Sequence, residues 1–347
     1  MKKMVALLLV LMLAFGLVAC SSGGDNGDNG DGGGGEEGLT GHLVIYTSEP
    51  QDLVTEMLEA FIAANPGVTY ELFRSGTGDV KAKLDTELQA GGTDADLIWF
   101  ADIGYMYNLD EQDLIMHYSP DAAADLPDDY KYNDGMGHEV RAIYAAIAYN
   151  TTKVTDPPKD WDDITTEDYR GVVALANPNY SGGAFTTLMA HIQNEDLVGW
   201  EWYNKLKAID AKMEQSNGTL STKVASGEYE AVVVIDYLPR NAKKDGSPVD
   251  YIYPASGAVM VPTPLCIMNT IEEENVEAAK ALVDFMFTTD NQKLFVDQGY
   301  VPMNSAAAEG TDVPTIDEIE VMPFDLEFYV ENSDAVRQEY VRLFGAE

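Results

Sequence analysis

Cysteine and basic residues are both scarce in this 347-residue sequence. Two cysteines cannot build a disulfide framework or a cysteine-type zinc site. Only 21 lysines and arginines stand against 59 aspartates and glutamates, so the formal net charge is −38. Such a chain cannot neutralise a run of phosphates, which excludes a general nucleic-acid binder. Long apolar runs are absent beyond the extreme N-terminus, which excludes a body with several membrane spans.

The sequence also lacks the common catalytic motifs. It contains no Gly-x-Ser-x-Gly elbow and no phosphate loop that ends in Gly-Lys-Ser/Thr. His138-Glu139 lacks the second histidine of a zincin, and His42, His117 and His191 are scattered, so we predict neither a metal nor a cofactor. These absences favour a protein that is not an enzyme. An anchored extracytoplasmic hydrolase is the less favoured class, because no residue of the sequence stands out as a catalytic nucleophile.

The N-terminal segment has the composition of a targeting signal followed by a flexible tether. The apolar stretch 5–18 is too short for a comfortable spanning helix and is typical of a secretory signal. The ending Leu17-Val18-Ala19-Cys20 is similar to a bacterial lipobox, in which cleavage removes residues 1–19 and leaves a lipid on Cys20; an uncleaved anchor is the alternative. Residues 20–38 are rich in Gly, Ser, Asp and Asn and should form a flexible tether. We therefore predict an extracytoplasmic protein that is lipid-anchored to the cell membrane.

From residue 39 onward, short apolar runs alternate with segments of helical periodicity. Strands are predicted at 43–46, 68–72, 97–100, 143–149, 172–176, 231–235, 258–261 and 265–268. Apolar residues recur at helical spacing within 53–64, 80–88, 185–192 and 276–288. Strands that alternate with helices form parallel sheets covered on both faces, so the predicted fold class is α/β.

The order of these elements predicts two α/β lobes, the first interrupted by the second. Lobe I is expected to comprise 39–142 and 255–320, lobe II 143–254, and the C-terminal helices within 321–347 should pack on the lobes. Connecting segments near 141–144 and 251–257 are expected to form two hinge crossovers, with a central ligand cleft between the lobes.

Three loops with hydroxyl or glycine residues follow predicted strands and open predicted helices. Their candidate ligand-binding residues are Thr47 and Ser48; Ser75, Gly76 and Thr77; and Ser181, Gly182 and Gly183. In open parallel sheets ligands bind beyond the carboxyl ends of the strands, where glycines admit close backbone approach and helix ends carry partial positive charge. Each loop taken alone is more simply an ordinary helix N-cap. Three of them on facing lobes favour a shared anionic or zwitterionic ligand.

A fourth candidate lies where Asp236-Tyr237 ends a very apolar predicted strand. The Asp236 carboxylate could accept a ligand ammonium or hydroxyl, and the Tyr237 hydroxyl could donate. A solvated strand end that caps the next turn is an equal alternative. Four cations could counter a ligand phosphate, although the sequence does not place them relative to the cleft: Arg74, Lys81, Arg141 and Arg240.

Several motifs together resemble the extracellular solute-binding lipoproteins of ATP-binding-cassette importers, in the branch of ferric-iron, thiamine, phosphonate and organophosphate binders. The resemblance covers residues 41–305 and is carried by Val44-Ile45-Tyr46, Ser75-Gly76-Thr77-Gly78, Asp94-Ala95-Asp96-Leu97, Ala148-Tyr149-Asn150-Thr151, Ser181-Gly182-Gly183-Ala184-Phe185, Ser226-Gly227-Glu228, Gly246-Ser247-Pro248-Val249, Tyr253-Pro254 and Gly257. It implies a two-lobed, type II periplasmic-binding-protein-like fold. A monomer of this kind closes on a small solute and then docks on a membrane permease with its ATPase.

The resemblance also bears on the ligand. The ferric binders carry a histidine in the first loop, a glutamate after the third strand and two adjacent tyrosines. Here the corresponding stretches are Ser48-Glu49-Pro50, Phe100-Ala101-Asp102 and Tyr237-Leu238, so direct iron chelation is not expected and Asp102 joins the predicted ligand-binding set. The serine–glycine loops resemble those that hold the anionic group of phosphonates and organophosphates, which is the ligand class we predict, with an amine facing Asp236. The acidity favours a cationic ligand such as thiamine or a polyamine as the alternative, with ferric iron also open.

Overall fold

The computed structural model describes residues 38–345 except 125, 128 and 129. The predicted signal segment, Cys20 and all of the tether but Gly38 lie outside the described residues, so lipid anchoring stays a prediction. Among the described helices, none combines the length and the apolar character that a membrane span requires.

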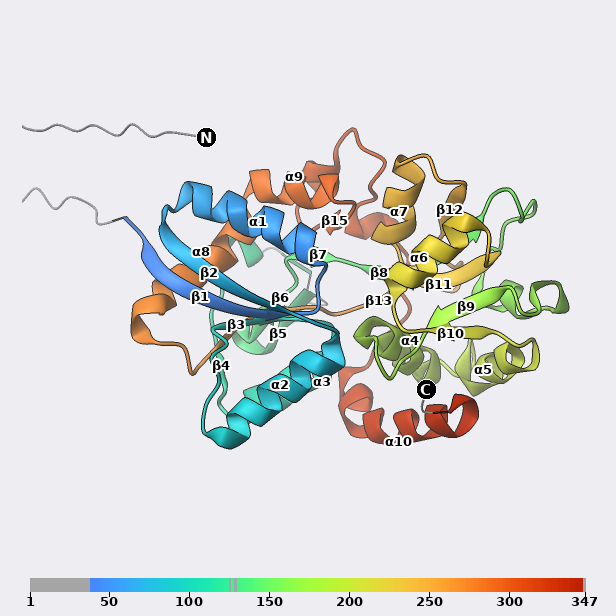
Figure 1. The fold of residues 1–347 in the computed structure, drawn as a ribbon, viewed down its shortest axis with the longest axis horizontal. Coiled ribbons are helices and arrows are strands. Elements are labelled where there is room, and N and C mark those ends of the chain that lie inside the picture. The colour runs from blue at the N-terminus through green and yellow to red at the C-terminus, as the bar shows by residue number, and fades with distance from the viewer. Residues whose placement is uncertain (1–37, 125, 128–129, 346–347) are drawn as a thin grey trace, which may run out of the picture. The chain divides into compact units, whose positions relative to one another are not determined.

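Seven strands form the first sheet (Figure 1). β1 (Thr40–Thr47) pairs in parallel with β2 (Gly67–Arg74) on one side and with β3 (Leu97–Trp99) on the other. β14 (Leu265–Met268) returns from late in the chain and lies antiparallel to β3. The remaining strands are β4 (Ile115–Met116), β5 (Lys131–Tyr132) and β6 (Gly137–His138), all in antiparallel pairs. The predicted parallel pairing is confirmed for β1 to β3, and the complete sheet is mixed.

Helices cover both faces of the first sheet, and its central strands β3 and β14 are fully buried, as their continuous apolar runs predict. Leu43 and Ile45 of β1 share one core cluster with Phe61 of the first helix, whereas Tyr46 joins the cluster on the opposite face. The helices of the first face are α1 (Gln51–Ala64), α8 (Val276–Met286) and α9 (Thr289–Asp297), and those of the second face are α2 (Thr77–Ala90) and α3 (Ile103–Asp110). α2 ends at Gly91, whose left-handed backbone conformation is the usual helix stop.

The second sheet has six strands and is also covered on both faces. In spatial order its strands are β10 (Lys212–Glu214), β9 (Val173–Ala176), β11 (Ala231–Ile235), β8 (Tyr144–Asn150) and β12 (Val249–Ile252), with β13 (Val259–Met260) paired to β8. Its helices are α4 (Gly182–Gln193) and α5 (Gly199–Ala208) on one face, and α6 (Asn217–Ser226) and α7 (Tyr237–Lys244) on the other. The prediction of two α/β units is therefore confirmed in outline.

The chain passes between the two sheets at more than one place. A small ladder of β7 (Arg141–Ala142) with β15 (Val301–Pro302) precedes the first passage into β8. The prediction that 258–261 returns to the first sheet is wrong, because β13 pairs with β8, with Val259 opposite Ala145. The second passage is therefore 261–264. A short apolar run does not reveal which of two sheets it joins, and for this reason the prediction assigned 258–261 to the wrong sheet.

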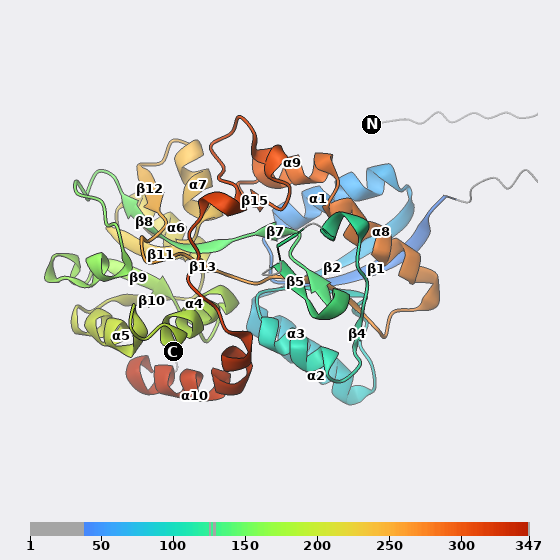
Figure 2. The same cartoon turned by 180° about the vertical axis from the view of Figure 1, so that it is seen from behind.

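The C-terminal segment makes a further passage. Val321 forms a β-bridge with Ala258, next to β13, and the long helix α10 (Leu326–Phe344) packs on α4 and also on α3 (Figure 2). Short 3-10 helices complete the described fold: η1 (Asp121–Ala123), η3 (Asn133–Gly135), η4 (Trp161–Thr165), η5 (Glu167–Tyr169), η6 (Glu273–Asn275), η7 (Ser305–Ala308) and η8 (Ile316–Glu318). Apart from the start of the second part of lobe I, which the pairing of β13 moves from 255 to beyond 260, the lobe boundaries drawn from the sequence stay a prediction.

Candidate functional site

The predicted glycine loops lie at the carboxyl ends of parallel strands and begin helices. α2 starts at Thr77 after an extended Gly76, and α4 starts at Gly182 after Ser181. The Ser181 hydroxyl accepts hydrogen bonds from the Ala184 amide and from the Asn217 side chain, each at 3.3 Å. Ser181 is therefore an N-cap that is tied to the start of α6 as well.

Two of the three loops meet across the two sheets. A Cβ added to Gly182 would lie 1.9 Å from the Ala101 carbonyl oxygen and 3.0 Å from Thr77 Oγ1. A Cβ on Gly76 would lie 3.7 Å from the Tyr180 carbonyl oxygen. Gly183 instead faces its own sheet, with its Cβ position 3.2 Å from Ile235 Cδ1. The structure thus brings the Ser75–Thr77 loop against Ser181-Gly182, and only a residue without a side chain fits at position 182.

The backbone amides at these two helix starts are unused. Within the described part of the chain, the amides of Thr77, Gly78, Gly182 and Gly183 have no hydrogen-bond acceptor. Each helix start also carries a partial positive charge from its aligned peptide dipoles. Two such ends that face each other repel, unless an anion lies between or beside them.

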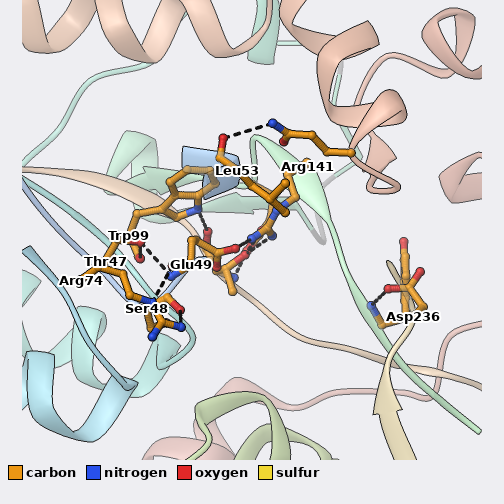
Figure 3. Close-up of polar contacts among 12 residues, drawn as sticks. Thr47, Ser48, Glu49, Leu53, Arg74, Trp99, Arg141 and Asp236 are labelled. Atoms are coloured by element: carbon orange, nitrogen blue, oxygen red, sulfur yellow. Dashed lines mark hydrogen bonds and ion pairs between the residues drawn. The ribbon is translucent and has the colours of Figure 1, made fainter. Parts of the chain in front are cut away.

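The third predicted loop, Thr47-Ser48, serves the architecture as much as the site (Figure 3). Thr47 is fully buried; its hydroxyl donates to the Trp99 carbonyl at 2.6 Å and accepts from the Glu49 amide at 3.0 Å. The carbonyl groups of Ser48 and Glu49 accept from Arg74 Nη2 at 3.3 Å and Nε at 2.9 Å. Thr47 therefore shapes the loop, and the loop in turn fixes the exposed Arg74 beside Ser75.

The four candidate cations differ in their ion-pair partners. Lys81 pairs with Asp102 at 2.5 Å, Arg141 pairs with Glu49, and Arg240 pairs with Asp236 at 2.7 Å. Arg74 has no ion-pair partner among the residues that the structure describes. Its guanidinium is therefore the cation of this group that is available to a ligand at the loops.

The prediction that Asp236 accepts a ligand ammonium does not fit this geometry. Asp236 is fully buried. Its Oδ1 accepts from the Tyr144 amide at 3.0 Å, and its Oδ2 accepts from Arg240 Nη2 and from the Tyr253 hydroxyl, both at 2.7 Å. These protein donors satisfy the carboxylate. Asp236 therefore holds the end of β11 against β8 and α7, and the alternative of a solvated strand end is wrong as well.

The other two predicted residues, Tyr237 and Asp102, also have partners within the protein. Tyr237 is half-buried with its ring 4.6 Å from that of Tyr300, and burial raises the pKa of its hydroxyl, so the group stays a neutral donor. Asp102 caps α3 by accepting from the Tyr105 amide at 3.0 Å, while its other oxygen binds Lys81. The roles of both residues in ligand binding stay predictions.

Sequence reasoning missed a buried polar network where the chain passes between the sheets. Arg141 is fully buried, pairs with Glu49, and donates from Nη1 to Thr263 Oγ1 at 2.6 Å. Glu139 accepts from the Thr263 amide at 2.6 Å and from the Tyr132 hydroxyl at 3.0 Å. The network thus joins both passages to the loop that follows β1. The signal was two charges, Glu139 and Arg141, next to a long apolar run.

We expect Glu139 to make the stability of the protein depend on pH. Burial raises the pKa of Glu139 from 4.5 to about 7, although Arg141 opposes the rise. The folded state therefore holds a proton that the unfolded state releases, and the resulting stabilisation is present below pH 4.5 and is lost as the pH rises through 7. Between pH 5 and 7 the loss should be about 2 kcal/mol.

Urea denaturation of wild type and Glu139→Gln at pH 5, 6, 7 and 8 measures this effect. The difference between the two proteins is the decisive quantity, because buried His191, with its pKa lowered to about 3 by burial, acts in both and in the opposite direction. A difference that stays constant from pH 5 to pH 7 would show that Glu139 does not titrate in this range.

Among the residues that the structure describes, no group of three or more His, Cys, Asp or Glu side chains is placed to hold a metal ion. The geometry instead offers two opposed helix starts, hydroxyl groups and the Arg74 guanidinium, which has no ion-pair partner among the described residues. Comparison with known proteins then decides the family. The model of the bacterial extracellular solute-binding proteins matches residues 56–320, which is more than half of the chain.

The chain belongs to the bacterial extracellular solute-binding proteins. This solute-binding protein is 24% identical over 277 residues to a probable ABC transporter periplasmic-binding protein of Sinorhizobium fredii, with 76% of this chain and 75% of the relative covered. It is also 24% identical over 320 residues to an uncharacterized protein of Haemophilus influenzae, with 87% and 90% covered.

Solved structures confirm the two-lobed fold of this solute-binding protein. The periplasmic binding protein AfuA of Actinobacillus pleuropneumoniae, described with exogenous fructose-6-phosphate bound, superposes with a TM-score of 0.76 at 19% identity, covering 88% of this chain and 99% of that one. Iron-bound HitA of Pseudomonas aeruginosa gives a TM-score of 0.72 at 17% identity, covering 86% and 99%. These two neighbours bind different ligands, so the shared fold does not select between them.

Proposed function

We propose that this solute-binding protein captures a small organic anion that carries a phosphate or phosphonate group, and delivers it to the permease of an ABC importer. The observation that carries the proposal is the meeting of the α2 and α4 helix starts, with four unused amides between them. An anionic group at this place accepts from the Thr77, Gly78, Gly182 and Gly183 amides and removes the repulsion between the two helix ends.

The strength of binding must come from several groups together. A helix end stabilises an anion by roughly 0.3–1 kcal/mol, and by up to about 2 kcal/mol when partly buried. A micromolar affinity corresponds to about 8 kcal/mol. Arg74 supplies charge-assisted hydrogen bonds from the rim, since Ser48 and Glu49 already hold its guanidinium in place. Closure of the loops over the anion excludes water and strengthens each of these contacts.

Cationic ligands receive less support from the same loops. The carboxylates near them are engaged: Asp79 accepts from the Ser75 hydroxyl at 2.7 Å, Asp102 pairs with Lys81, and Asp236 pairs with Arg240. A thiamine or a polyamine would therefore have to displace an internal partner. We infer that the net charge of −38 keeps the protein soluble and does not select the ligand.

We further propose that the lipid on Cys20 and the segment after it hold the monomeric binding domain beside its permease. A membrane anchor of this kind keeps the local concentration of the binding protein high at the transporter. This part of the proposal rests on the sequence of residues 17–38.

A ligand screen tests the chemical class. We expect a rise in melting temperature with sugar phosphates or phosphonates, followed by saturable binding without turnover in calorimetry, because a ligand that binds only the folded state stabilises it. The same screen contains thiamine, spermidine and ferric citrate. A response confined to those cations, or steady conversion of a compound, would overturn the proposal.

The variant Thr77→Asp should abolish binding of the anion that wild type binds. It places a carboxylate at the first residue of α2, where a negative charge favours the helix but repels the ligand. Thr77→Asn has nearly the same shape without the charge and serves as the matched control. Calorimetry should show no measurable binding for the aspartate variant and at most a modest loss for the asparagine variant. Equal affinities for the two variants would place the anion elsewhere.

A further inference from the structure

The C-terminal helix α10 lies outside the segment that the family model matches, and it contacts both sides of the site. It packs on both α4 and α3, and several of its hydrogen bonds go to the second-sheet side. Arg337 donates to the Pro178 carbonyl at 2.9 Å, in the loop that leads to Ser181, and its guanidinium lies 3.8 Å from the centre of the Phe185 ring. Gln193 of α4 exchanges two hydrogen bonds with the backbone of Asp325 at 2.7 and 2.8 Å. α10 is therefore firmly attached to the α4 side.

One residue of α10 reaches the opposite side. Tyr329 is buried, with 1% of its surface exposed, and its ring lies 5.7 Å from Phe185 of α4 in an edge-to-face arrangement. Its hydroxyl donates to Asp102 Oδ1 at 3.4 Å, in the loop that follows β3. A Cβ added to Gly104 in the first turn of α3 would lie 2.7 and 2.9 Å from atoms of the Tyr329 ring. The ring thus lies directly on the start of α3.

We propose that Tyr329 is a positioning residue for the closed form of the binding protein. α10 moves with α4, whereas Asp102 and Gly104 move with the first sheet, so the Tyr329 contact exists only when the two loops meet. It brings together the same loops that place Gly182 against Ala101. Through Tyr329 the C-terminal helix biases the equilibrium towards closure without contact between α10 and the solute. The inference rests on the closing motion of the proposed function and not on the chemical class of the ligand.

The helix contains its own matched control. Tyr340 also lies on α10 and is also 1% exposed, but its hydroxyl has no hydrogen-bond partner among the described residues. Tyr329→Phe removes a hydroxyl that hydrogen-bonds from α10 to Asp102 on the opposite side, whereas Tyr340→Phe removes one without a hydrogen bond to any described residue. Gly104→Ala tests the same contact from the α3 side, because the added methyl group would lie 2.7 Å from the Tyr329 ring in this arrangement and should therefore disfavour it.

Distance measurements between spin labels test the inference in the absence of any ligand. Labels are attached at Glu59→Cys on α1 and Glu201→Cys on α5, both exposed positions, in the full chain with Cys20→Ser; Cys266 is buried and stays. We expect wild type and Tyr340→Phe to share one distribution with a short-distance population. Tyr329→Phe and Gly104→Ala should lower the ratio of short to long distances at least threefold, with melting temperatures close to that of Tyr340→Phe.

Two results would overturn the inference. One is an identical distribution in wild type, Tyr329→Phe and Gly104→Ala. The other is a wild-type distribution without a short distance, because the contact would then not favour closure. Since no solute is present, the result is independent of whether the phosphate screen finds a ligand.

Discussion

Gly182→Ala should lower the affinity for an anionic solute about 10- to 100-fold while the melting temperature of the ligand-free protein stays nearly unchanged. The added methyl group would lie 1.9 Å from the Ala101 carbonyl oxygen, which belongs to the backbone of the opposite side and cannot rotate away. Forcing a methyl group into such a contact costs about 1–3 kcal/mol, and each factor of ten in affinity corresponds to about 1.4 kcal/mol. Separation of the two loops would take the methyl group away from Ala101, so we expect the fold itself to be spared.

Gly78→Ala is the control for this prediction. Gly78 lies in the first turn of α2, in the same contact region, but its added Cβ would be 3.9 Å from the Asn179 carbonyl oxygen, an ordinary van der Waals distance. Calorimetry with the compound that stabilises wild type compares the three proteins. If Gly182→Ala binds as tightly as Gly78→Ala, the solute does not require these loops to meet.

Asp236→Asn should destabilise the fold by about 3 kcal/mol and should not change ligand selectivity in a specific way. The substitution removes the negative charge beside buried Arg240, whose Nη2 lies 2.7 Å from Asp236 Oδ2. Arg240 is 7% exposed and then keeps only neutral partners, chiefly the hydroxyl groups of Tyr251 and Tyr253 and the Gly299 carbonyl. Breaking a buried ion pair by removing one partner costs about 3–5 kcal/mol, and asparagine retains part of the hydrogen bonding.

Asp250→Asn provides the comparison for the buried pair. Asp250 pairs with Lys243 at 2.7 Å, but the Lys243 side chain is 54% exposed, and solvent-exposed pairs contribute about 0–1 kcal/mol. Urea denaturation at pH 7 measures both variants against wild type. A loss for Asp236→Asn that does not exceed the loss for Asp250→Asn would contradict the structural role of Asp236, and would reopen its role at the ligand.

The elements with strong local patterns were predictable from the sequence. The strand 231–235 is uniformly apolar and coincides with β11, and 265–268 coincides with β14. The α4 start was predicted from Ser181-Gly182-Gly183, since a serine cap followed by small residues is a local signal. The position of β13 was not predictable, because two residues of strand carry no information about their partner.

In the candidate site, too, the local features were predictable and the contacts between distant residues were not. That Ser75–Thr77 and Ser181-Gly182 begin helices was visible in the residues themselves. Which cation remains available was not, because Arg74, Lys81, Arg141 and Arg240 differ only in the carboxylates that the fold brings to them. Asp236 was misassigned for this reason: its partner Arg240 lies one helical turn away, yet only the packing of α7 shows that both are buried.

The sequence by itself determined the α/β class, the two units, the helix starts and the family resemblance, since each of these depends on residue type and local spacing. The tertiary structure alone decided which helix starts face each other, which charges are neutralised, and that the C-terminal helix reaches across to Asp102. These features depend on contacts between residues far apart in the chain, and local periodicity does not encode such distances.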